Sequence, residues 1–191
     1  MRRGESFAIS MANEPEFVDA MLGSEIAGTV FVPIDPRISS DRLGYMLRHA
    51  ECKGAIVSPE VLPRLLNIRK DVPELTWIWV VGEVPALEGV QALCSVLAQT
   101  KNPLPAVPSS LEAPMQMLFT SGTTGDPKAI LSPYARFAGV AALNEVIGLQ
   151  PDDRPYTGLS LTHANAQLVS LGNALSMSLE ITISRRFTKS R

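Results

Sequence analysis

The sequence predicts an α/β protein in which mainly parallel sheets are covered by helices. Three observations lead to this class. Short runs rich in β-branched and aromatic residues alternate with segments whose apolar residues recur at helical spacing. The strand-like runs are apolar throughout, as in TVFVPI at 29–34 and WIWVVG at 77–82, which is typical of strands buried on both faces. Residues such as Gly28 and Pro36 mark the ends of neighbouring segments.

Strands and helices alternate through the first hundred residues. We expect Asn13 to cap the first helix, Pro15 to lie in its first turn and Gly28 to end it. A cluster of polar capping residues at 39–41 precedes the next apolar stripe. The expected strands are 6–12, 29–34, 54–58 and 77–82, and the expected helices are 13–28, 39–50, 61–66 and 86–99.

The composition changes after residue 100, where prolines become frequent. Proline at that density continues neither a helix nor a central strand, so 101–114 is expected to be a linker. The linker separates a first α/β lobe, residues 1–100, from the start of a second lobe, residues 115–191. Neither chain end carries a cap or a stop signal, so the second lobe is expected to be truncated. Its expected strands are 115–120, 156–161 and 181–184, and its expected helices are 134–148 and 164–179.

Composition excludes several classes of function. The formal net charge of −2 gives no basic footprint for nucleic acid. No apolar run is long enough to cross a membrane, and polar residues interrupt the segment that follows the first arginines, so no signal peptide is expected. Cys52 and Cys94 lie far apart, which favours free thiols in a reducing compartment. The sequence therefore indicates a cytoplasmic protein.

The stretch FTSGTTGDPKAI at 119–130 holds the residues with the clearest chemistry. Hydroxyl side chains, glycines that permit an inward-facing run of N–H groups, and one lysine suit a polyphosphate. A Walker-type loop is excluded, because Asp126 and Pro127 separate Gly125 from Lys128. From composition alone, an ordinary polar turn stays an equal alternative. The candidate phosphate-binding residues are Thr120, Ser121, Gly122, Thr123, Thr124, Gly125 and Lys128.

The order of these residues resembles a known signature. T-S-G-T-T-G-x-P-K at 120–128 is similar to the phosphate-binding motif of the acyl-adenylate-forming superfamily of AMP-dependent synthetases and ligases. Residues 13–57 look like the opening segment of the family's N-terminal domain. The stretch LSLTHANAQ at 159–167 resembles the motif around L-P-L-[FY]-H, and its H-x-N-A-Q part is most like acyl-CoA ligases of the carnitine, crotonobetaine and feruloyl type.

The resemblance implies a function and a site. Family enzymes join a carboxylate to ATP, release pyrophosphate, and transfer the acyl group to a thiol, usually that of coenzyme A. The loop residues would hold the β- and γ-phosphates together with Mg²⁺, and His163 would border the acyl pocket. The implied partners are ATP, a small carboxylate and CoA. His49 has no matching context and receives no role.

The resemblance covers well under half of a complete family member. The metal-binding glutamate, the ribose-binding aspartate and the C-terminal lid with its lysine are missing, so the chain by itself is expected to be inactive and to expose apolar surface that favours self-association. Two alternatives stay open: an adenylation domain that serves a carrier protein, and a non-catalytic nucleotide-binding remnant. The departures at Ala129, Ser160 and Thr162 favour the remnant, and Ala129 would strain the loop if its position needed a positive φ.

Overall fold

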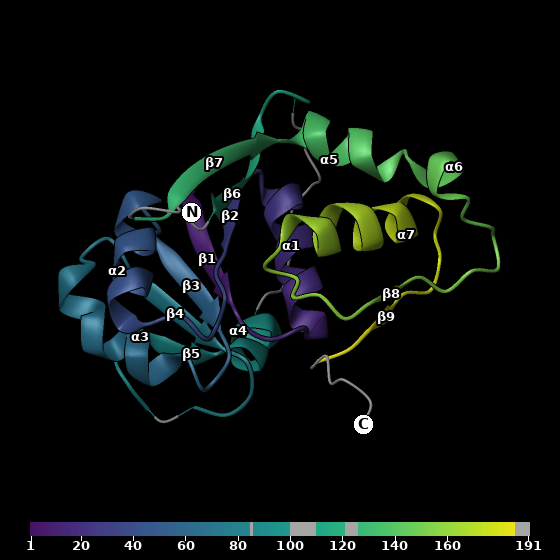
Figure 1. The fold of residues 1–191 in the computed structure, drawn as a ribbon. Helices are drawn as coiled ribbons and strands as arrows, with labels where there is room; N and C mark the ends of the chain where they lie inside the picture. The colour runs from purple at the N-terminus through teal and green to yellow at the C-terminus, as the bar shows by residue number, and fades with distance from the viewer. Residues whose placement is uncertain (85, 100–109, 121–125, 186–191) are drawn as a thin grey trace.

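The chain folds around one seven-stranded sheet. The structure, a computed structural model, describes residues 1–84, 86–99, 110–120 and 126–185. The strand order is β5-β4-β3-β1-β2-β6-β7, and every pairing is parallel except that of β6 with β7 (Figure 1). The predicted class, mainly parallel strands flanked by helices, is confirmed. The strands are β1 (Ser6–Ser10), β2 (Val30–Pro33), β3 (Gly54–Val57), β4 (Trp77–Val80), β5 (Val90–Ala92), β6 (Pro114–Thr120) and β7 (Lys128–Pro133).

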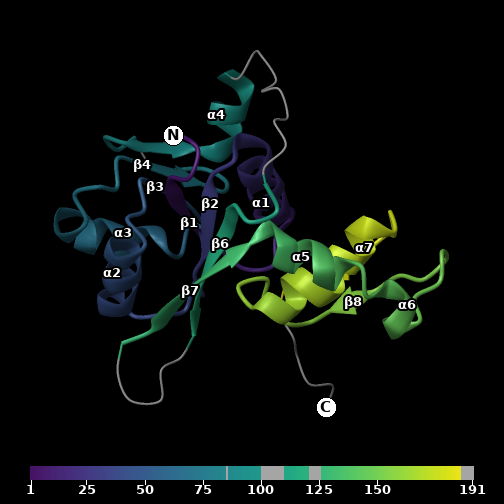
Figure 2. The same cartoon turned by 90° about the horizontal axis from the view of Figure 1, so that it is seen from above.

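Helices cover both faces of this sheet. On one face, α2 (Ser40–His49) and α3 (Leu62–Ile68) enclose a core that includes Val32, Leu47 and Leu65. On the other face, α1 (Pro15–Ala27) and α4 (Leu93–Gln99) pack against Ile9 and Phe31 (Figures 1 and 2). A short 3₁₀ turn, η1 (Arg69–Asp71), links α3 to the segment before β4. The continuous apolar character of the strands follows from this burial on two sides.

The ends of α1 test two predictions. Gly28 ends the helix in the left-handed region, with φ of 68°, as predicted. The prediction for the other end is wrong, because Glu14 rather than Asn13 is the N-cap residue and neither side chain caps the helix. The amide of Asn13 instead bonds to backbone more than 140 residues away, a contact that local pattern cannot indicate.

Two strands were absent from the sequence prediction. The region expected to form one helix over 86–99 contains β5, which pairs with β4, before α4 begins at Leu93. The residues that follow the glycine-rich loop form β7, which pairs with β6, before α5 (Tyr134–Ala141) begins. In both places a partner strand decides the local structure, which a helical or turn-like composition does not reveal.

The sheet continues across the predicted linker. β6 opens the expected second lobe, yet it is paired with β2 at Phe31 and Gln116. Part of the linker, residues 101–109, lies outside the described residues, as does residue 100 before it. The lobe boundaries themselves stay a prediction.

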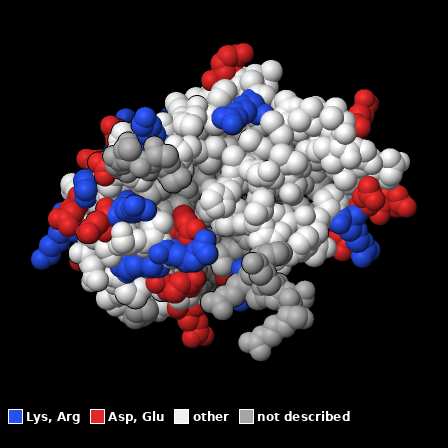
Figure 3. Space-filling model, viewed as in Figure 1, with Lys and Arg blue, Asp and Glu red and all other residues white. Residues whose placement is uncertain are grey.

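The remaining elements follow α5, and two of them, the π-helix η2 (Asn165–Leu171) and α7 (Gly172–Ser176), pack against it. The others are α6 (Asn144–Ile147) and the two-stranded parallel sheet of β8 (Tyr156–Thr157) and β9 (Thr182–Ile183). Leu161, Ala166 and Leu171 are buried in the same core as Ile9, so this layer belongs to the α1 side of the sheet. Figure 3 shows that charged side chains gather over α2 and α3, whereas the face over α5 and α7 carries few of them.

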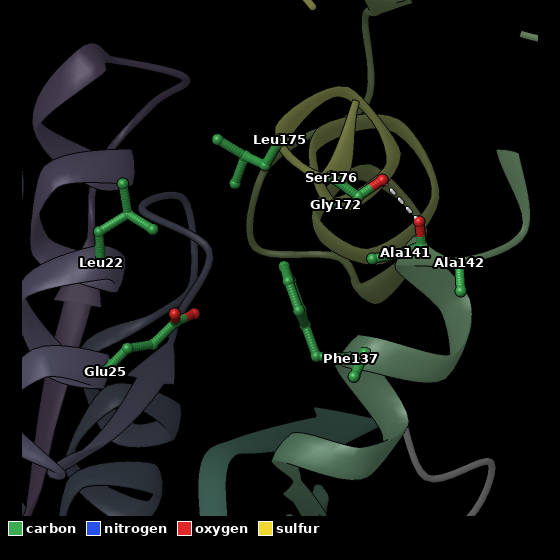
Figure 4. A pocket seen from close by; sticks show the side chains of 9 residues that line it. Leu22, Glu25, Phe137, Ala141, Ala142, Gly172, Leu175 and Ser176 are labelled. Carbon is green, nitrogen blue, oxygen red and sulfur yellow. Dashed lines mark hydrogen bonds between the residues drawn. The ribbon is translucent and has the colours of Figure 1, made fainter. Parts of the chain in front are cut away.

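A pocket lies where α1, α5 and α7 meet. Its volume is about 460 Å³, and Leu22, Phe137 and Leu175 line it together with small residues (Figure 4). Glu25 is the one ionisable side chain in this lining, and its Oε1 finds no hydrogen-bond partner among the described residues. Burial raises the pKa of the Glu25 carboxyl from 4.5 to about 7.

The first prediction concerns packing at β3. A Cβ at Gly54 would lie 1.8 Å from Cε2 of Trp77, so Gly54→Ala forces the indole or the strand to move. We expect a loss of about 1–3 kcal/mol in the free energy of unfolding, measured with urea. Gly23→Ala, whose new Cβ meets nothing within 4 Å on a helix, is the control and should gain up to about 1 kcal/mol. Equal stability of the Gly54 variant and the wild type would contradict the packing described for Trp77.

The second prediction concerns pH. Glu25 holds its proton more tightly in the folded chain, so the free energy of unfolding falls as the pH rises from 4.5 through about 7. Glu25→Gln cannot ionise, and it should therefore gain stability over the wild type above about pH 7 but not below about pH 4.5. Urea unfolding across this range measures the difference. The control is Asp19→Asn, which removes an exposed carboxylate from the same helix. If the stability difference between Glu25→Gln and the wild type changes no more with pH than that of this control, the buried carboxyl is refuted.

Candidate active site

The glycine-rich loop connects the two strands of a β-hairpin. β6 runs parallel to β2, so the loop leaves the sheet at the carboxyl ends of the parallel strands, where α/β sheets commonly bind ligands. Phe31 lies opposite Gln116, and the last residues of β6 therefore extend beyond Pro33, where β2 ends. The central loop residues Ser121, Gly122, Thr123, Thr124 and Gly125 lie outside the described residues.

The two ends of the loop face each other. Thr120 and Lys128 are register partners across the hairpin, and both are exposed. Side chains of directly opposed antiparallel residues lie on the same face of the sheet. The Thr120 hydroxyl also donates to the Lys128 carbonyl, with 3.4 Å between the oxygens. The predicted lysine and the predicted threonine thus stand together at the base of the loop.

Ala129 does not strain the hairpin. It pairs with Phe119 in regular antiparallel register. The non-glycine residues with positive φ in the described ranges are Glu51 and Ser178, so Ala129 has an ordinary extended backbone. Alanine would cost free energy at this position only if the backbone had a positive φ, and it does not.

An aromatic cluster fixes the hairpin over α2. The rings of Phe119 and His49 meet edge to face with 5.9 Å between their centroids, and His49 stacks on Tyr45 at 5.6 Å. The sequence assigned His49 no role, and the structure gives it one in packing. The strand that leads into the loop is held from the side by this cluster.

His163 stands at the entrance to the π-helix η2. Its side chain is exposed, and its backbone N–H donates to the Ser160 carbonyl at 3.0 Å, which closes a tight turn. Within that turn the hydroxyls of Ser160 and Thr162 are 2.8 Å apart. π-helical turns are rare and are frequently found at functional sites. A buried turn thus presents the imidazole to solvent.

Asp35 is a candidate site residue that sequence reasoning missed. It follows β2, and Arg37 donates to both of its carboxylate oxygens, with Nε at 3.0 Å and Nη2 at 2.7 Å. The Arg37 side chain holds the pKa of the Asp35 carboxyl below its usual value, and the nearby His163 imidazole contributes in the same direction. The charge of His163 therefore acts on a carboxyl that follows β2. The Asp between two prolines, directly after a predicted strand, was the available signal.

Other kinds of site are not found in the described part of the chain. No group of three or more His, Cys, Asp or Glu side chains could hold a metal ion there. None of the helices described is both long and apolar enough to cross a membrane. Cys52 and Cys94 are free thiols, and burial raises the pKa of Cys52 to about 12, which keeps this thiol protonated.

Sequence comparisons identify relatives that are longer than this chain. It is 28% identical over 197 residues to Long-chain fatty acid transport protein 6 of Mus musculus, a match covering 100% of this chain and 31% of the relative. It is 29% identical over 181 residues to crotonobetaine/carnitine–CoA ligase of Salmonella typhi, covering 92% and 35%. The chain thus spans about a third of the length of these curated relatives.

Solved structures share the fold. The crystal structure of the anthranilate CoA ligase AuaEII in complex with anthranoyl-AMP matches with a TM-score of 0.90 at 26% identity, over 100% of this chain and 36% of that one. The N-terminal domain of FACL13 from Mycobacterium tuberculosis matches with a TM-score of 0.85 at 22% identity, which supports the fold alone.

A family model described as "AMP-binding enzyme" matches residues 1–191, which is the whole chain. Its signature loop occupies the hairpin between β6 and β7, and the sheet has the architecture of the N-terminal part of adenylate-forming ligases. The chain therefore belongs to the AMP-binding enzyme family.

Proposed function

We propose that this chain is the phosphate-binding part of an ATP-dependent, AMP-forming acid–thiol ligase. The carboxylate oxygen attacks the α-phosphorus of ATP and pyrophosphate leaves; a thiol then attacks the acyl carbon and AMP leaves. The observation that carries the proposal is the β-hairpin of β6 and β7. β6 ends at Thr120, β7 begins at Lys128, and the signature loop connects them. Family membership supports the same reaction class.

The loop supplies electrostatic stabilisation. Negative charge shifts onto the leaving pyrophosphate, so donors aimed at the β- and γ-phosphates lower the barrier. In this proposal Lys128 supplies the point charge and Thr120 a hydroxyl from the same face of the hairpin. The rest of the cradle consists of Ser121, Gly122, Thr123, Thr124 and Gly125.

His163 is proposed to border the acyl group and the entry of the thiol. Its electrostatic effect on Asp35, which follows the end of β2, supports a place near the edge of the sheet from which the loop departs. The coenzyme A ligases among the relatives favour CoA over a carrier protein as the thiol. The substrate that supplies the acyl group is a small carboxylate in this proposal.

Mg²⁺ would enter with ATP as its counter-ion. Across the described residues no set of three metal-binding side chains exists, and so we assign the ion no ligand in this chain. The carboxylates that would hold it belong to the part of the family fold beyond these 191 residues, as the sequence resemblance implies.

By itself the chain is proposed to bind nucleotide without forming an adenylate, since it spans about a third of its relatives' length. We also propose that it self-associates through exposed apolar residues. These lie on β7, around α6 and on α7, toward the face that Figure 3 shows with few charges, and include Ile130, Leu131, Leu143, Val146, Ile147 and Leu175.

The third prediction tests the loop directly. Lys128→Ala removes the loop's lysine and should weaken ATP binding by about tenfold or more, because a charge-assisted bond to phosphate is lost. Isothermal titration calorimetry of the 191-residue chain with ATP measures the change. Lys70→Ala, which removes an equal exposed charge from η1, should leave the affinity unchanged. Equal weakening by both variants would mean that only net charge matters, and no binding by the wild type would overturn the proposed function.

A further inference from the structure

The turn that carries His163 is attached to the distant first strand by a single buried side chain. Asn13 Nδ2 donates to the carbonyl oxygen of Leu159 at 2.8 Å and to that of Ser184 at 3.0 Å. The Leu161 N–H donates to Asn13 Oδ1 at 2.7 Å. One amide directly after β1 thus ties together two segments that are 146 and 171 residues away.

A second amide holds the same turn from the opposite side. Gln167, fully buried in η2, donates from Nε2 to the Leu161 carbonyl at 2.5 Å. The two backbone polar groups of Leu161 therefore each bond to a buried amide side chain, and its own side chain is fully buried as well. His163 lies two residues later, and its backbone N–H donates to the Ser160 carbonyl.

These bonds leave the turn little freedom. A buried backbone group needs a partner, and the buried Leu161 N–H finds its partner in Asn13, whose amide also donates to the part-buried Leu159 carbonyl. Removing that amide leaves both groups without the bond, and leaving a buried polar group unsatisfied is costly enough to make the turn rearrange. The imidazole at its end would move with it.

We propose that Asn13 is a positioning residue for His163, fixing the turn that presents the imidazole. The inference rests on the proposed function only in assigning His163 to the acyl and thiol site. It deepens that proposal by adding a residue that touches no substrate. The geometry itself can be tested in the absence of any ligand.

The chain contains two histidines, which makes the test sharp. In protein labelled at the histidine rings, NMR should give two sets of imidazole signals, assigned with His163→Ala. His49, held between Tyr45 and Phe119, serves as an internal reference. We expect Asn13→Ala to shift or broaden the His163 signals by more than a line width and to leave those of His49 unchanged.

A near-isosteric variant separates the individual bonds. Asn13→Asp keeps an acceptor for the Leu161 N–H but loses both donated bonds and sets a carboxylate against two carbonyl oxygens. Hydrogen exchange of the Leu161 amide should accelerate in Asn13→Ala and stay slow in Asn13→Asp. The His163 signals should move in both variants.

The matched control is Arg185→Gln. It removes the ion pair between Arg185 and Glu14, at the residue next to Asn13, while all the bonds of Asn13 remain. This variant should leave the His163 signals in place. An equal shift from Arg185→Gln would assign the effect to general loosening of the chain end and would overturn the proposal.

The remaining outcomes are also decisive. His163 signals that coincide with those of the wild type in Asn13→Ala or Asn13→Asp, with His49 intact, would refute positioning by Asn13. If Asn13→Ala fails to fold, Asn13→Asp decides by the same criterion, and simultaneous loss of both histidine signals there would assign Asn13 to overall stability alone. Failure of the wild type to bind ATP would overturn the proposed function and leave this geometric result standing.

Discussion

The pairing of β2 with β6 is the contact on which the rest of the architecture depends. Without this pairing, strands β1 to β5 would form one sheet, and the signature loop would belong to a separate β-hairpin. With Phe31 opposite Gln116, the hairpin becomes part of the parallel sheet, and its loop emerges beyond the carboxyl end of β2. Asp35 follows the same end of that strand, and the charge of His163 acts on its carboxyl. The pairing thus sets the signature loop at the edge of the sheet that Asp35 also borders.

Local pattern predicted those elements whose stability comes from their own residues or from simple burial. The apolar runs at β1 to β4 formed strands, and Gly28 ended α1 in the left-handed region that glycine adopts without strain. The failures share one physical cause, which is a contact that forms only in the folded chain. β5 exists because β4 lies beside it, and β7 exists because β6 does. Asn13 had the residue type and the position of a helix cap. Its amide instead forms hydrogen bonds with the backbone of Leu159 and Leu161, which local pattern does not indicate.

The candidate site was predictable as a motif and less so as geometry. The order of residues at 120–128 indicated phosphate binding, and the structure adds that Thr120 and Lys128 are opposed at the base of a hairpin. Asp35 was missed although it directly follows a predicted strand, because a single carboxylate is not by itself a signature. Arg37 pairs with it from two residues away, and the charge of His163 acts on it only in the folded chain. His49 was passed over for the same reason, since its contacts with Tyr45 and Phe119 join α2 to β6.

The departures from the family pattern bear on whether this chain is a degenerate remnant. Ala129 suits an ordinary strand position and carries no positive φ. Ser160 and Thr162 replace a proline and an aromatic residue, and their hydroxyls bond to each other at 2.8 Å within the turn that holds His163. Thr162 is buried there, and its N–H also donates to the Ser160 hydroxyl. The two hydroxyls thus bond to each other, whereas Oε1 of the nearby Gln167 has no hydrogen-bond partner among the described residues. The non-catalytic remnant therefore stays an alternative to the proposed ligase.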